Sequence, residues 1–558
     1  MRKIFALIAM FSAAIIGVAG CAGIPRSGSV QAGVEVGATV DNEVQFLPTG
    51  PIADASPEDI LRGFVDAATS PADDWGVART FLTSDYQSVW QPSRGVTIDR
   101  GNRIVANSDS DSYSLKVTQL AHVDEWGLYS DGQPTTTTLD FSLIQENGQW
   151  RIAQAPDGII LDASLFPQVF SETQLYFYDA NFQRLVPDNR WFPARSSTAT
   201  RAVKALLQGP ARWMSLSGGV VSAFPPGALL VADSVPIDES TAVVNFDVKS
   251  LAANDVTLQR MVTQIAASLT SVPGVTRARM VLSGARQLEA DVPLASTLLS
   301  STYLTSPTVL TGQVFSSIGS TPGTVQTPLS KKIVQLRPSL ISMAASQNEV
   351  ATLIGGQAAV IDANGGVRVV DKRAGLVAPV MDTYGYVWTA PALVPAAVRI
   401  SPAPTASAGL RMPWERATSL VALAVSPEGS RVVASYRVGP KFELCVASIH
   451  RNAANAPVEV GPCLLIPVEA TEVGPVAWID ASRVGVVTYT ATTSTIHTVR
   501  IGGLTTTSQV NARVVTVTGS GSALVARVLT AEGDVLQQVA SPRWYLVATG
   551  VDALASVQ

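Results

Sequence analysis

Histidine is scarce in this chain, whose 558 residues include only His122, His450 and His497. They are too few and too widely spaced for an HExxH zinc motif or a histidine-based catalytic triad. The patterns GxSxG, GxxxxGK and GxGxxG are also absent, so the sequence indicates neither a nucleophile elbow nor a nucleotide-binding loop. These absences favour a binding protein over an enzyme.

Clusters of basic residues are missing as well. The chain carries 39 Lys and Arg against 44 Asp and Glu, for a net charge of −5, and its basic runs are as short as Lys331-Lys332 and Lys372-Arg373. Nucleic acid is therefore not expected as a partner. Asp109 and Asp111 lack the third carboxylate, the glycine and the terminal glutamate of an EF-hand loop. The sequence predicts no metal and no cofactor.

Long apolar runs occur only at the N-terminus. After residue 21 no segment holds 18 consecutive apolar residues, although 47% of all residues are hydrophobic and the mean hydropathy is +0.25. A transmembrane helix needs about 20 such residues. The chain beyond residue 21 is therefore expected to fold in water, and it is long enough for about three to five domains.

Residues 1–20 have the layout of a lipoprotein signal peptide. Two basic residues follow Met1, residues 4–17 are apolar except for one serine, and residues 18–21 resemble a lipobox that ends on Cys21. This resemblance implies that the mature chain begins at Cys21, with a diacylglyceryl group on its sulfur and an acyl chain such as palmitate on its amine. An ordinary secretory signal and an uncleaved anchor remain as alternatives.

The predicted location is the extracytoplasmic face of the cell membrane, with the lipid on Cys21 as the anchor. Residues 21–55 are rich in Gly, Ser, Pro, Val and Thr and show no sustained periodicity. Such a tether would hold the first folded domain roughly 30 Å from the bilayer.

Two further cysteines, Cys445 and Cys463, remain in the chain. In an oxidising compartment an isolated pair is best explained as a disulfide. The flanking segments 442–449 and 463–468 have the composition of neighbouring strands, and a bridge between them would contribute about 3 kcal/mol in the chain-entropy model. The alternative is a pair of buried, reduced thiols.

Residues 56–165 are predicted to form an α+β domain. Ser56 is a good helix N-cap, Pro57 fits the first turn, and apolar side chains recur on one face from residue 60 to 68. A second short helix is expected around residues 75–82. Strands are expected at 114–119, 136–145 and 150–153, and Asn147-Gly148 is expected to form the hairpin turn between the last two. The pattern resembles the NTF2-like fold.

Residues 170–290 alternate between strands and helices. A strand at 173–179 is followed by a helix, a strand at 242–247, a second helix at 258–269 and a strand at 277–282. The segments AVKALLQGP, FPPGALLVADS and AVVNFDV occur in this order and resemble the GerMN domain of spore germination and actinobacterial envelope proteins. That resemblance implies an α/β-type module.

Short strands and turns dominate the rest of the chain. Residues 291–330 are rich in Ser, Thr and Pro and form either a linker or the first strand of the C-terminal region. Residues 331–558 show almost no helical periodicity and repeat a strand, polar turn, strand pattern, as in AVSPEGSRVVASYR. The pattern resembles a TolB-like β-propeller with five or six blades, and a pair of β-sandwiches is the alternative.

Aromatic residues are the candidates for a binding surface. Each of them is more simply explained as part of a hydrophobic core, and the sequence does not separate the two roles. They are Trp388, Trp414, Trp478 and Trp544 in the propeller-like part and Tyr176, Tyr178, Trp191, Phe192 and Trp213 in the GerMN-like part.

The lipobox, the NTF2-like part, the GerMN-like part and the propeller, in this order, resemble the LpqB lipoproteins of actinobacteria over nearly the whole chain. The resemblance implies a non-enzymatic accessory lipoprotein. It also implies a partner, the extracytoplasmic part of the Mtr sensor kinase, and a role in signalling linked to cell-wall growth and division. The alternative is a protein that binds or hydrolyses envelope glycan or peptidoglycan through the propeller channel.

Overall fold

The computed structural model describes residues 48–557, and these residues belong to one compact unit. No helix among them is long and apolar enough to cross a membrane. The predicted signal peptide and most of the predicted tether lie outside the described residues. The gaps inside the described range are 108, 110, 195–196, 248–253, 270, 283–285, 292–305, 320–326, 403–409, 522–524 and 540–541.

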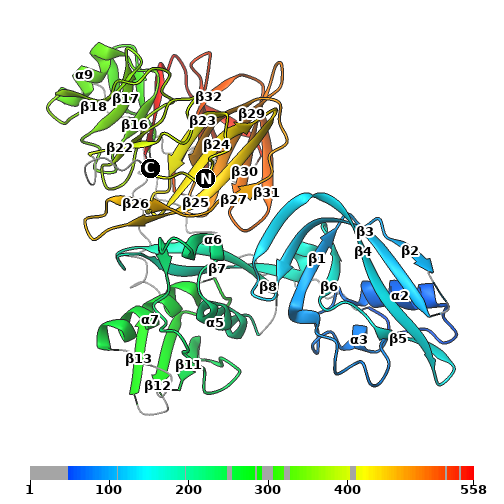
Figure 1. Cartoon of the computed structure of the whole chain (residues 1–558). Helices are drawn as coiled ribbons and strands as arrows, with labels where there is room; N and C mark the ends of the chain where they lie inside the picture. The colour runs from blue at the N-terminus through cyan, green and yellow to red at the C-terminus, as the bar shows by residue number, and fades with distance from the viewer. Residues whose placement is uncertain are drawn as a thin grey trace, which may run out of the picture. The chain divides into compact units, whose positions relative to one another are not determined.

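The N-terminal domain, residues 57–169, begins with helix α2 (Pro57–Ala67). The Ser56 hydroxyl accepts a hydrogen bond from the backbone N–H of Asp59 at 3.2 Å, as expected of an N-cap. The apolar face of α2 is buried and lies against the sheet (Figure 1). The second helix is a single turn, α3 (Gly76–Arg79). It begins one residue later than predicted because Trp75 has a left-handed backbone conformation, and it ends before the predicted residue 82.

One sheet, in the order β5-β4-β3-β1-β6, forms the rest of this domain. Asn147 and Gly148 have φ values of 54° and 75°, the signs that a type I′ hairpin requires, so the predicted turn between β4 and β5 is confirmed. The elements are η1 (Pro92–Arg94), β1 (Gly95–Asp99), β2 (Ile104–Asn107), β3 (Ser112–Asp124), β4 (Tyr129–Glu146), β5 (Gln149–Gln154), β6 (Ile159–Asp162) and α4 (Phe166–Val169).

The middle domain, residues 170–291, has two sheets around one hydrophobic core. Strands β11 and β12 are parallel, and helix α7 makes the crossover between them while packing on β7, β12 and β13. The elements are β7 (Phe170–Asp179), β8 (Leu185–Pro193), α5 (Thr198–Gln208), α6 (Arg212–Ser215), β9 (Val220–Val221), β10 (Ile237–Asp238), β11 (Thr241–Phe246), α7 (Asp255–Leu269), β12 (Arg277–Leu282) and β13 (Arg286–Asp291).

The C-terminal domain, residues 308–557, consists mainly of antiparallel strands, which form five sheets in the described part of the chain (Figure 1). The repeated strand, turn, strand segments of the sequence are successive antiparallel pairs such as β23 with β24 and β28 with β29. Buried Val and Ala side chains along these strands fill the space between neighbouring sheets.

The strands of the first three sheets are β14 (Thr308–Thr311), β15 (Val314–Ser317), β16 (Ile341–Met343), β17 (Val350–Ile354), β18 (Gln357–Ile361), β19 (Val367–Asp371), β20 (Val380–Met381), β21 (Val387–Thr389), β22 (Arg399–Ser401), β23 (Ser419–Val425), β24 (Arg431–Val438), β25 (Lys441–Arg451), β26 (Pro457–Val460) and β27 (Leu464–Ile466). Those of the last two are β28 (Val473–Trp478), β29 (Arg483–Tyr489), β30 (Ser494–Arg500), β31 (Thr505–Val510), β32 (Val514–Gly519), β33 (Val525–Thr530), β34 (Val535–Val539) and β35 (Trp544–Ala548).

The last strand, β36 (Ala553–Val557), lies between β14 and β16 and joins the two ends of this domain in one sheet. The sequence left residues 291–330 as a linker or a first strand, and the structure places two strands, β14 and β15, in that stretch. Helix α9 (Pro328–Leu336) crosses the boundary predicted at residue 331, so the expectation of an all-strand region was wrong there. Thr327 caps this helix, and Leu329 and Ile333 bury its short apolar face.

Candidate functional site

Two of the three cysteines lie among the described residues. Cys21, the predicted lipidation site, lies outside the described residues. Cys445 is fully buried in β25 and is joined by a disulfide to Cys463, which comes just before β27. Because β27 pairs with β25 next to this point, the bridge ties two neighbouring strands of one sheet.

Peptide mapping of the purified full chain without reducing agent is expected to find Cys445 and Cys463 in one linked pair, because Cys445 lies in β25, Cys463 directly precedes the paired strand β27, and their compartment is predicted to be oxidising. Breaking the link with Cys463→Ser should lower the free energy of unfolding by about 3 kcal/mol, the loop-closure value for a loop of this length. Two alkylatable thiols in the native protein would contradict this prediction.

Trp191, on β8, contacts all three domains. Its backbone N–H donates to the carbonyl of Gly127 in the N-terminal domain at 2.8 Å. Its indole Nε1 donates to the carbonyl of Gly502 in the C-terminal domain at 3.1 Å, and its ring lies 4.8 Å from that of Phe166. The sequence named this tryptophan as a binding candidate that a core role explains more simply, and it is buried at the junction of the domains rather than inside one of them.

The middle domain binds the C-terminal domain through polar side chains. Glu172 of β7 forms an ion pair with Arg500, and Asn189 donates to the carbonyl of Ile501 at 2.7 Å. The Ser217 and Ser448 hydroxyl groups lie 2.9 Å apart. These contacts come from several elements of each domain, so the interface between the two domains does not depend on a single pair of residues.

Every second side chain of strand β7 lies at the interface between the middle and C-terminal domains. Glu172, Gln174 and Tyr176 face the C-terminal domain, whereas Leu175 and Phe177 enter the core of the middle domain. Burial, together with the negative charge of Asp480, raises the pKa of Tyr176 to about 12. The alternation of polar and apolar residues along β7 is a pattern of the sequence. That the polar face of β7 lies against the C-terminal domain is shown only by the structure.

A polar cleft of about 830 Å³, part of it open to solvent, lies along this face of β7. Its acids and bases are already paired, Glu172 with Arg500 and Asp480 with Arg483 at 2.7 Å. A neutral, hydroxyl-rich group therefore suits it better than an ion. It is lined by Glu172, Gln174, Tyr176, Ser271, Asp480, Ala481, Ser482, Arg483, Arg500 and Gly521.

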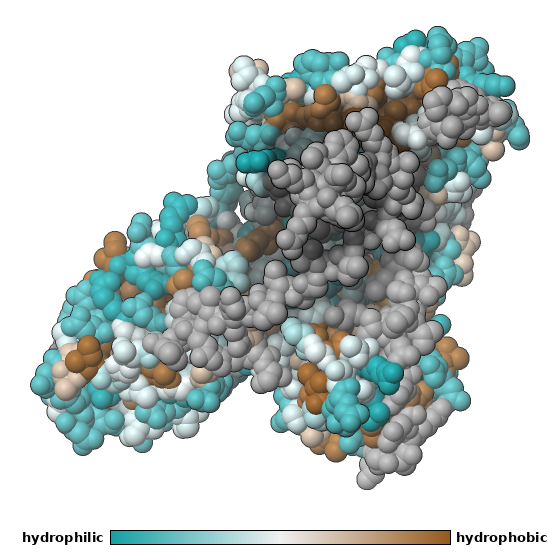
Figure 2. Space-filling view, turned by 180° about the vertical axis from the view of Figure 1, so that it is seen from behind, coloured by the Kyte–Doolittle hydropathy of each residue, from teal (hydrophilic) through white to brown (hydrophobic). Residues whose placement is uncertain are grey.

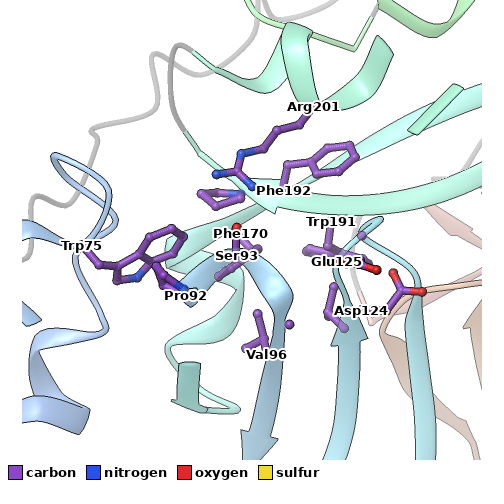
Figure 3. A pocket seen from close by; sticks show the side chains of 14 residues that line it. Trp75, Pro92, Ser93, Val96, Asp124, Glu125, Phe170, Trp191, Phe192 and Arg201 are labelled. Carbon is purple, nitrogen blue, oxygen red and sulfur yellow. The ribbon is translucent and has the colours of Figure 1, made fainter. Parts of the chain in front are cut away.

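A second, mainly aromatic pocket lies between the N-terminal and middle domains (Figure 3); its empty space of about 290 Å³ includes space open to solvent, and the enclosed part is small. Trp75, Phe170, Trp191 and Phe192 provide its apolar walls, and all four are buried. The Arg201 side chain, from helix α5, extends toward the space between Trp75 and Phe192 in Figure 3. The sequence named Trp191 and Phe192 as aromatic candidates but did not group them with Trp75 and Phe170, because the lining comes from both domains.

Strand β35 is an open sheet edge with apolar side chains. It pairs with β34, and no other strand of the described chain covers its outer side. Tyr545, Leu546 and Val547 are 53%, 59% and 37% exposed, whereas Trp544 packs against the core. The other tryptophans of this domain that the sequence considered are buried: Trp388, Trp414 and Trp478. A strand of this kind is a ready template for pairing with an extended segment of another protein.

Within the described residues, no group of three or more His, Cys, Asp or Glu side chains is arranged to hold a metal ion. His497 contacts the Thr488 hydroxyl at 2.9 Å, and burial lowers the pKa of its imidazole.

On the face drawn in Figure 2, hydrophobic residues gather in separate patches among hydrophilic ones.

Three family models match the chain one after another. Residues 50–167 match the N-terminal domain of lipoprotein LpqB, residues 174–288 match the model described as sporulation and spore germination, and residues 312–555 match the β-propeller domain of lipoprotein LpqB. These matches confirm the predicted multidomain fold, with a GerMN-like domain and a C-terminal propeller. The NTF2-like form of the N-terminal domain stays a prediction.

Individual relatives agree with these matches. Lipoprotein LpqB of Cutibacterium acnes is 28% identical over 278 residues, which cover 50% of this chain and 46% of the relative. Lipoprotein LpqB of Nocardia farcinica is 30% identical over 209 residues, which cover 37% of this chain and 34% of the relative. The first GerMN domain of the sporulation protein GerM from Bacillus subtilis is 22% identical and covers 20% of this chain and 84% of that structure, at a TM-score of 0.17. The chain thus spans about a third to half of the length of these curated relatives.

Proposed function

We propose that this chain, which belongs to the LpqB lipoprotein family, is a lipid-anchored extracytoplasmic accessory protein without catalytic activity of its own. In this proposal it binds the extracytoplasmic part of the Mtr sensor kinase and modulates signalling linked to cell-wall growth and division. The kinase partner is inferred from the family resemblance. The lipid anchor rests on the lipobox at Cys21.

The open edge of β35 is the observation that carries a binding function. An exposed strand with three large apolar side chains offers backbone N–H and C=O groups for pairing and apolar area for burial. The corresponding outer strand of the neighbouring sheet, β31, exposes threonines instead. We therefore place the kinase contact on β35, to which an extended segment of the kinase would add as a further strand.

A photo-crosslinking phenylalanine analogue in place of Tyr545, in the full chain in living cells, tests this contact. We expect a crosslinked product that contains the sensor kinase, because a partner strand on β35 would lie beside this side chain. The products are identified by mass spectrometry after affinity purification of the chain.

The matched control is the same analogue in place of Thr506 on β31, which is exposed on an outer strand of the same domain. We expect at least tenfold less kinase in its products. Crosslinks from Tyr545 without the kinase, from cells in which the chain is anchored and abundant, would contradict the proposed partner. Equal yields at both positions would contradict the proposed surface.

A further inference from the structure

Arg201 is a partly buried cation with no ion-pair partner among the described residues. Its guanidinium forms no side-chain hydrogen bond and no ion pair with any residue that the structure describes, although it lines the aromatic pocket of Figure 3. Burial lowers the pKa of Arg201, and the negative charge of Asp74 only partly opposes this. A partly desolvated guanidinium without a counterion lowers the stability of the fold. A bound anion would offset this loss of free energy.

The acids near this pocket are already engaged. The Asp124 carboxylate accepts hydrogen bonds from the backbone N–H groups of Trp126 and Leu128, both at 2.9 Å. Glu125 forms an ion pair with Arg94 at 3.5 Å. Asp74 is paired with Arg79. These three carboxylates are thus engaged by other groups, and none of them forms an ion pair with Arg201; Asp74 acts on it only through its charge.

A strained segment supports one wall of the pocket. Asp73, Asp74 and Trp75 have φ values of 49°, 53° and 58°, so three successive non-glycine residues lie in the left-handed region. Each such residue costs on the order of 1 kcal/mol or more, and strain of this kind gathers at ligand clamps. The indole Nε1 of Trp75 donates to the carbonyl of Ala68 at 3.0 Å, which fixes the ring beside the pocket.

We propose that this pocket binds a carboxylate attached to a small apolar group, with Arg201 as the group that holds the carboxylate. The planar guanidinium matches a carboxylate through two parallel hydrogen bonds, and the aromatic walls suit the apolar part while they exclude water. The limited volume of the pocket favours a small ligand. Two sources share this chemistry, a free short-chain carboxylic acid and the C-terminal carboxylate of a peptide. The inference does not depend on the kinase partner.

Ligand-detected NMR on the full chain in detergent tests the site with three probes: isobutyrate, N-acetyl-alanyl-alanine, and the C-terminal amide of the same peptide. We expect at least one of the two carboxylates to bind and the amide to bind at least tenfold more weakly. Binding of isobutyrate as tightly as the peptide would identify a free acid as the source. Binding of the peptide alone would identify a peptide C-terminus.

Arg201→Met keeps the length of the side chain and removes its charge. We expect at least a tenfold loss of carboxylate affinity with an unchanged or higher Tm, because an unpaired cation is removed. A purely structural arginine would give a lower Tm. Arg212→Met is the matched control, since Arg212 is exposed on the next helix, α6, does not line the pocket and should leave affinity unchanged.

Three results would overturn the site: no binding of either carboxylate to the wild-type chain, equal binding of the amide, or unchanged affinity in Arg201→Met. If this variant fails to fold, the comparison of the acid with its amide on the wild-type chain decides the outcome. Arg201→Lys gives a further check, because it keeps the charge but loses the planar fork and should retain only part of the affinity.

Discussion

Asp382→Ala is expected to lower the free energy of unfolding of the propeller by about 3–5 kcal/mol, because it leaves a buried guanidinium without its carboxylate. Asp382 is fully buried in the turn between β20 and β21. Its carboxylate accepts hydrogen bonds from Nη2 of Arg451 at 2.6 Å and from Nε1 of Trp388 at 3.0 Å. Since Arg451 ends β25, the pair joins two neighbouring sheets, and calorimetry should show a Tm lower by roughly 10 °C.

Two variants control for this effect. In Asp382→Ala/Arg451→Met the uncompensated charge is gone, so the loss should be smaller than in the single variant. Glu472→Ala breaks the ion pair with Arg513, in which both side chains are about half exposed, and should lower stability far less than Asp382→Ala because water screens an exposed pair. A single variant as stable as the wild type, or a double variant less stable than the single one, would contradict the role given to the pair.

Elements set by neighbouring residues were predicted well. The Ser56 cap, the hairpin turn at Asn147-Gly148 and the crossover helix α7 depend on side chains within one or two turns of the chain. Their signals are capping groups, left-handed glycine and asparagine, and a regular apolar face. Such signals stay readable in any tertiary surrounding.

Elements that depend on distant partners were left open or not predicted. The stretch that holds β14 was predicted as either a linker or a first strand. Strand β14 is completed by β36, and their paired residues Val309 and Leu554 are far apart in the sequence. Helix α9 buries only Leu329 and Ile333, too few residues for a clear helical period. Trp75 was expected at the start of a helix, because three successive left-handed residues without glycine have no composition signal.

The candidate sites illustrate the same limit. Tyr176 and Trp191 were recognised as aromatic residues that could serve either a core or a surface, but their roles depend on contacts between domains. The sequence does not distinguish Arg201 from other arginines, because an arginine is common on an amphipathic helix such as α5. That no residue of the described part of the chain pairs with it becomes apparent only in the folded structure, where two domains close the pocket around it.

Cys21→Ser is expected to abolish lipid attachment and to leave an unprocessed precursor that still carries residues 1–20. The lipobox places the acceptor sulfur at this position, and a serine hydroxyl does not replace the thiolate as a nucleophile. Mass spectrometry of the intact protein should show the mature wild-type chain starting at residue 21 with acyl chains, and the variant without them.

Cys445→Ser is the matched control, because it removes a cysteine from the chain and leaves the leader intact. This variant should be processed and acylated like the wild type, even where its stability falls. Normal cleavage before residue 21 in Cys21→Ser, with release of an unmodified chain, would show an ordinary secretory signal and remove the anchor. The distinction matters for the proposed function, because two or more acyl chains hold a protein at the bilayer while one gives only marginal binding. A chain freed from the membrane would no longer be confined near the outer face of a membrane kinase.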